Sequence, residues 1–68
     1  MRAKLTDRKD GLRFYEIVDG PRWWTAAHWF AQDRWHLQNE KLIEVNEMSK
    51  LGCRIVAACE TEAKQLDL

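Results

Sequence analysis

The chain has 68 residues, which is enough for one small domain whose hydrophobic core alone supplies about 3 to 5 kcal/mol. Apolar residues make up 46% of the chain and charged residues 32%, and this balance argues against a disordered segment. The 11 basic and 11 acidic residues give zero net charge, which excludes the long-range basic field of a dedicated nucleic-acid binder. We therefore expect a single folded domain over residues 1–68.

The first eighteen residues divide into two parts. Residues 1–11, MRAKLTDRKDG, lack a periodic apolar pattern and end in Asp-Gly, so they predict a flexible lead-in that closes in a turn. Residues 12–18, LRFYEIV, are rich in aromatic and β-branched side chains and predict a short strand. A single helical turn ended by Gly20 is the alternative.

A long central helix is predicted over residues 22–51. Pro21 fits the first turn of a helix, and no proline or glycine follows before Gly52. Such a helix would be roughly 45 Å long, whereas a compact monomer of this length has a radius of gyration of only about 11 Å. We therefore expect a homodimer in which two chains cover each other. A break near LQNEK, with KLIEV as a strand, would instead give a mixed fold.

The C-terminal segment follows Gly52, which is predicted to end the central helix as a C-cap. Ile55, Val56 and Cys59 recur at helical spacing, so we predict a second, shorter helix that returns along the first. The predicted fold class is thus mainly α and dimeric, with one extended segment at 12–18. The alternative is a small α+β fold with strands near 12–18 and 53–59.

All four tryptophans of the chain lie between Trp23 and Trp35. On a helical projection Trp24 and Trp35 share one apolar side, while Trp29 lies on another. Because tryptophan is favoured at interfaces, we predict that Trp24 and Trp35 pack inside and that a protein-binding face is formed by Trp23, Trp29, His36 and Ile43. The alternative, in which all four tryptophans are core or partly exposed residues, remains open.

These patterns predict a non-enzymatic protein-interaction module, a small dimeric regulator or inhibitor with a protein partner of unknown identity. The size of the chain is typical of phage or mobile-element accessory proteins, an argument from analogy. A second hypothesis is a weak nucleic-acid-binding regulatory protein that uses Arg8, Lys9 and Arg13. The acidic residues interspersed among these basic ones weaken it, so we expect no nucleic-acid partner.

Enzymatic and metal-binding motifs are missing from the sequence. His28 and His36 are eight residues apart, and the chain contains neither C-x-x-C nor H-x-x-x-H, so no metal or cofactor is expected. Ser49 is the only serine and lies in no nucleophile elbow, which argues against an enzyme.

Localisation is inferred from the N-terminus and the two cysteines. Cys53 and Cys59 are too far apart in sequence to bridge within one helix or strand, and free thiols suit a reducing compartment. No signal peptide and no apolar run of about 20 residues are present, so we expect a cytoplasmic protein with no membrane partner.

Overall fold

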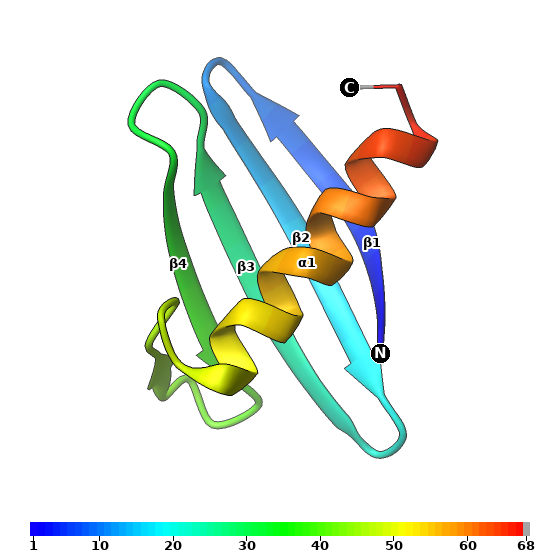
Figure 1. Cartoon of the computed structure of the whole chain (residues 1–68), viewed down its shortest axis with the longest axis vertical. Helices are drawn as coiled ribbons and strands as arrows, with labels where there is room; N and C mark the ends of the chain where they lie inside the picture. The colour runs from blue at the N-terminus through cyan, green and yellow to red at the C-terminus, as the bar shows by residue number, and fades with distance from the viewer. Residues whose placement is uncertain (68) are drawn as a thin grey trace.

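The computed structural model describes residues 1–67 and shows an antiparallel sheet with one helix across one face (Figure 1). Five strands follow one another in the sheet in chain order, each antiparallel to the next. The elements are β1 (Arg2–Lys9), β2 (Leu12–Asp19), β3 (Arg22–Trp29), β4 (Arg34–Asn39), β5 (Glu44–Val45) and α1 (Lys50–Gln65). The prediction of a mainly α fold with a helical interaction segment is therefore wrong.

The predicted central helix over 22–51 is replaced by β3, β4, β5 and the first two residues of α1. Within β3, Trp24, Ala26 and His28 are buried, and the residues between them point to the other side. This spacing has a period of two, which is the period of a strand. The chain reverses direction at Asp33 (φ 50°) and Leu42 (φ 62°), two non-glycine residues in left-handed conformations.

The N-terminal residues, which the sequence places in a lead-in, form β1 along one edge of the sheet. A bulge between Leu5 and Asp7 shifts the pairing of β1 with β2. The backbone N–H of Leu5 donates to Oε2 of Glu62 in α1 at 3.0 Å. Helix α1 thus binds β1 on the side that β2 leaves unpaired, and the edge strand is held to the domain from both sides.

Helix α1 confirms the predicted C-terminal helix but begins before Gly52. Ser49 is its N-cap, and the Ser49 hydroxyl accepts a hydrogen bond from the backbone N–H of Gly52 at 3.0 Å. Gly52 is therefore a buried residue of the first turn, not a C-cap. It packs so closely on the chain at Asn46 that a side chain has no room there.

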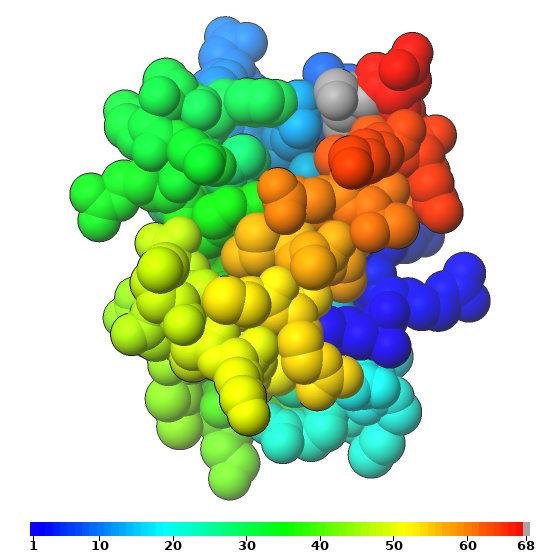
Figure 2. All heavy atoms as spheres, in the orientation of Figure 1, coloured from blue at the N-terminus to red at the C-terminus, as the bar shows by residue number. Residues whose placement is uncertain are grey.

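The core lies between the sheet and α1, whose side chains cover the face in view in Figure 2. It consists of Tyr15, Ile17, Trp24, Ala26, Leu37, Ile55 and Cys59. The radius of gyration is 11.0 Å, the value expected of a compact monomer of this length. Because residues 22–51 do not form one long helix, there is no helix here that a second chain would have to cover.

Both cysteines are free, and within residues 1–67 no helix has the length and apolar character needed to cross a bilayer. Cys59 is fully buried in the core, and burial raises the pKa of its thiol from 9.0 to about 12.

Candidate functional site

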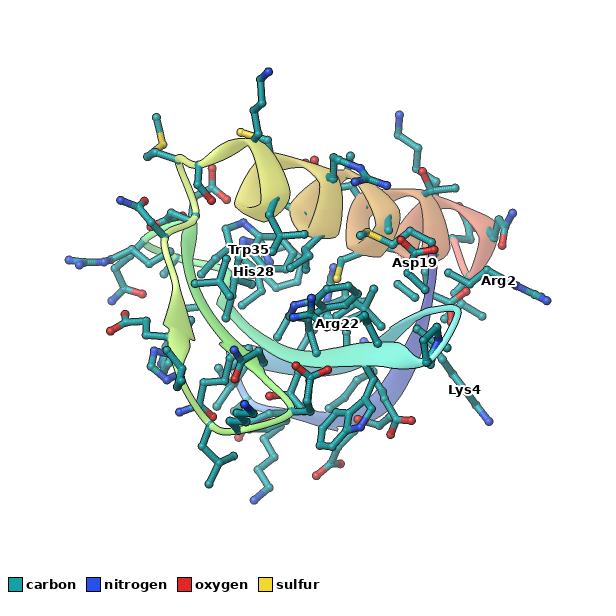
Figure 3. The ribbon with its side chains drawn as sticks, turned by 90° about the horizontal axis from the view of Figure 1, so that it is seen from below. Arg2, Lys4, Asp19, Arg22, His28 and Trp35 are labelled. Carbon is teal, nitrogen blue, oxygen red and sulfur yellow. The ribbon has the colours of Figure 1, made fainter. Side chains whose placement is uncertain are left out.

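The candidate site is the sheet face that α1 leaves uncovered, here called the open face. Strand alternation and the register place on it Arg2, Lys4, Asp7 and Lys9 of β1, Leu12, Phe14, Glu16 and Val18 of β2, Trp23, Thr25, Ala27 and Trp29 of β3, Arg34, His36 and Gln38 of β4, and Glu44 of β5. Figure 3 shows His28 and Trp35 beneath the helix, whereas Lys4 extends away from it.

The register arranges these side chains in four rows across the strands. The first row is Arg2, Val18 and Trp23, and the second is Lys4, Glu16, Thr25, Gln38 and Glu44. The third row is Asp7, Phe14, Ala27 and His36, and the fourth is Lys9, Leu12, Trp29 and Arg34. The two central strands contribute most of the apolar groups, and the outer strands contribute most of the charged ones.

Trp23 and Trp29 mark the two ends of the open face and are 41% and 40% exposed. They are six positions apart along β3, which corresponds to about 20 Å. Between them the small residues Thr25 and Ala27 form the floor of a shallow hollow of about 400 Å³, and Phe14 is part of its wall. The face therefore combines two exposed indole rings with a central recess.

The charges of the open face are mixed. It carries four basic side chains, Arg2, Lys4, Lys9 and Arg34, and three carboxylates, Asp7, Glu16 and Glu44. The Nδ1 atom of His36 lies 3.7 Å from Oε1 of Glu44, and Nζ of Lys9 lies 6.0 Å from the centre of the Phe14 ring. Alternating signs of this kind suit a protein surface better than a polyanion.

One end of the open face is fixed by an ion pair at its border. Glu40, in the turn after β4, accepts two hydrogen bonds from the Arg22 guanidinium at 3.1 and 3.2 Å and one from the backbone N–H of Trp23. The hydrogen bonds from Arg22 are the main cause that holds the pKa of the Glu40 carboxyl below its usual value. These contacts fix the backbone that carries Trp23.

Three of the four residues predicted to form the interface share the open face, namely Trp23, Trp29 and His36. Ile43 lies in the connection between β4 and β5 and is 58% exposed. The placement of Trp24 and Trp35 inside agrees with the structure: Trp24 is 3% exposed, and Trp35 is partly buried with its ring stacked on His28. That these residues bind a partner remains a prediction.

The basic residues of the alternative hypothesis do not form one patch. Arg8 and Arg13 are paired across β1 and β2, and the Arg13 guanidinium lies 3.5 Å from the centre of the Phe30 ring, near α1. Lys9 faces the opposite side of the sheet.

Sequence reasoning missed Phe14 and Val18, which alternate with the buried Tyr15 and Ile17 along β2. The run FYEIV carries this period-two pattern, and the pattern could have assigned two faces to the strand.

The two histidines lie on opposite faces of the sheet, so they cannot share a metal ion. His28 is beneath the helix with its Nε2 atom 2.8 Å from Oδ1 of Asp33, whereas His36 is on the open face. Among residues 1–67, the histidine, cysteine and carboxylate side chains form no group of three that could hold a metal ion.

The fold and the site define a small protein of one antiparallel sheet and one covering helix, with an aromatic sheet face exposed to solvent. Comparison with known proteins gives no match to a family model, to a curated protein or to a solved structure.

Proposed function

We propose that the chain is a non-enzymatic protein-interaction module, a small regulator or inhibitor that acts in the cytoplasm and binds protein through its open face. The observation that carries this proposal is the exposure of Trp23 and Trp29 on either side of a central recess. Large aromatic side chains around a pocket are typical of the residues that dominate protein interfaces. The two free cysteines are compatible with a reducing compartment.

The energy available at the two indole rings supports this role. A tryptophan exposes up to about 250 Å² in an extended chain, so 40% exposure leaves about 100 Å² on each of Trp23 and Trp29. Burying both would contribute about 5 kcal/mol at 25 cal/mol per Å². Association itself costs about 4 kcal/mol or more, so the two indole rings alone supply little net affinity. Burial of neighbours such as Phe14 and Val18 must supply the remainder.

The test is site-specific photo-cross-linking. A photoreactive amino acid replaces Thr25, which is exposed at the floor of the recess, and the matched control replaces the exposed Glu60 on α1. We expect protein adducts from position 25 in cells and none of the same mass from position 60.

Two results would contradict the proposed function. One is a complete lack of protein adducts from position 25. The other is an adduct that nuclease removes, which would favour nucleic-acid binding, and a steep fall of that binding with salt would support the same conclusion.

A further inference from the structure

We propose that the protein bound by the open face is a second copy of this chain. The two open faces pack against each other about a twofold axis that runs parallel to the strands and passes between β2 and β3. This inference rests on the proposed function, because it assigns an occupant to the same face. It is derived from the row-by-row arrangement of the open-face side chains.

Pairing of two copies through the sheet edge is obstructed at β1. Glu62 already binds the N–H of Leu5, and the bulge between Leu5 and Asp7 breaks the regular ladder. The strand sequence RAKLTDRK also places several like charges along this edge. These are devices by which proteins prevent edge-to-edge association, so β1 is a poor edge for pairing with a second copy.

The twofold axis determines which strands meet. Two sheets that pack face to face lie about 10 Å apart with their strands within about 30° of each other. Rotation about an axis parallel to the strands keeps each row at its own level and reverses the strand order. Strand β2 of one copy therefore lies over β3 of the other, and β1 lies over β4.

The apolar side chains are complementary in this arrangement. In the third row Phe14 of one copy lies over Ala27 of the other, so each phenyl ring enters the recess of the opposite copy. In the first row Val18 meets Trp23, and in the fourth row Leu12 meets Trp29. Each contact occurs twice, and a large side chain faces a smaller one every time.

The charged side chains are complementary as well. Lys4 lies over Gln38 of the other copy, and Glu44 is one strand further at about 4.8 Å, within reach of a lysine side chain. Asp7 lies over His36, whose ring N–H can donate a hydrogen bond to the carboxylate. There are two exceptions. In the fourth row Lys9 meets Arg34, and in the second row the Glu16 carboxylate lies over Thr25 with Lys4 of its own chain as its neighbour.

A twofold axis perpendicular to the strands gives a poorer match. It reverses the rows and places the Glu16 carboxylate over the Phe14 ring and Arg2 over Lys9. It also sets Thr25 against Ala27, which leaves the recess unfilled. A carboxylate buried on a ring and an empty cavity both oppose association, so the axis parallel to the strands is favoured.

The open face is large enough for a stable dimer. The two longer dimensions of the molecule are 28 and 22 Å, which outline a face of roughly 600 Å² before its corrugation is counted. A standard protein interface buries about 800 Å² of accessible surface on each partner. The face and such an interface are thus of similar size.

The experiment is sedimentation equilibrium of the purified chain from low to high micromolar concentration, with charge reversals on the face. Lys4→Glu places a carboxylate near Glu44 of the other copy at both symmetry-related contacts. This repulsion should weaken the dimer about tenfold. Glu44→Lys should do the same, and the double variant Lys4→Glu/Glu44→Lys should restore the wild-type dissociation constant to within about threefold. Arg34→Glu removes the like-charge contact with Lys9 and should tighten the dimer severalfold.

The control is Lys50→Glu, a charge reversal on α1 away from the open face, which should leave the dissociation constant unchanged. Circular dichroism of every variant confirms that the sheet is retained. A chain that stays monomeric at high micromolar concentration would overturn the inference, as would a dimer that the double variant does not restore.

The two proposals fail in different ways. If the chain is monomeric and position 25 cross-links to another protein, only the proposed self-association is overturned. If position 25 gives no protein adducts, the proposed function and the self-association are both overturned.

Discussion

Gly52 is a position where the addition of a single methyl group should clearly lower the free energy of unfolding. Alanine is ordinarily favoured over glycine in a helix by about 1 kcal/mol. In α1, however, a Cβ atom at residue 52 would clash with the carbonyl oxygen of Asn46 and lie 2.8 Å from the Cα of Glu47. Both neighbours are backbone atoms, so relief requires the helix or the preceding turn to move.

That movement also disturbs the helix cap. The carbonyl oxygen of Asn46 accepts hydrogen bonds from the backbone N–H of Ser49 at 3.0 Å and from its hydroxyl at 2.6 Å. The same hydroxyl binds the N–H of Gly52. Overpacking costs about 1 to 3 kcal/mol and a lost cap about 1 kcal/mol. After the gain in helix propensity, we expect Gly52→Ala to destabilise the fold by about 1 to 3 kcal/mol.

Urea unfolding followed by tryptophan fluorescence and circular dichroism measures this change. A domain of 68 residues has roughly 3 to 10 kcal/mol of stability, so the midpoint should fall clearly. Lys50→Ala is the matched control, because Lys50 is an exposed residue of the same turn and should change stability by about 0.5 kcal/mol or less. If Gly52→Ala instead stabilised the protein, as in an unobstructed helix, the close approach of α1 to Asn46 would be refuted.

Three further outcomes test the core, the edge strand and the two sets of tryptophans. In the unfolded chain the Cys59 thiol loses its proton near its ordinary pKa of 9.0, whereas in the folded protein its pKa is about 12. Between these pH values deprotonation favours the unfolded state, so the free energy of unfolding should fall by about 1.4 kcal/mol per pH unit. Unfolding curves across this range should show at least that slope, and Cys59→Ala should reduce it, leaving the contribution of Tyr15, whose pKa is also raised by burial. Glu62→Ala leaves the Leu5 N–H without its partner and should cost about 1 kcal/mol, with faster hydrogen exchange at that amide as the direct readout. Trp24→Ala should cost about 3 to 5 kcal/mol in thermal melts, whereas Trp29→Ala should retain the fold, and equal losses for the two would contradict the assignment of faces.

Local sequence patterns predicted two elements of the fold because those patterns do not depend on distant residues. The run LRFYEIV forms β2 with its β-branched and aromatic side chains, and the alanine-rich and glutamate-rich C-terminal segment forms α1. The inward placement of Trp24 also agreed, since residues that share a helical face can share a strand face as well. The sequence could therefore separate Trp24 from Trp29 without the correct secondary structure.

The long helix was predicted in error because the turns around β4 carry no glycine or proline. Asp33 and Leu42 adopt left-handed backbone conformations that a non-glycine residue rarely takes, so the sequence shows no interruption there. The centre of β3 contains Ala26 and Ala27, which favour a helix in isolation. Pairing with β2 on one side and β4 on the other overrides that preference, and such pairing is a tertiary effect.

The distribution of residues on the open face supports the proposal that this face is an interface. A face meant only for water would carry polar side chains on its central strands, as antiparallel sheets do when one side is solvated. Here six of the eight central-strand residues on the face are apolar, the polar ones being Glu16 and Thr25, and the other charged residues lie on β1, β4 and β5. An apolar centre with a polar rim is the anatomy of a protein interface. Because α1 covers only one face of the sheet, these apolar side chains lie at the surface of the single chain, and the proposed second copy would bury them.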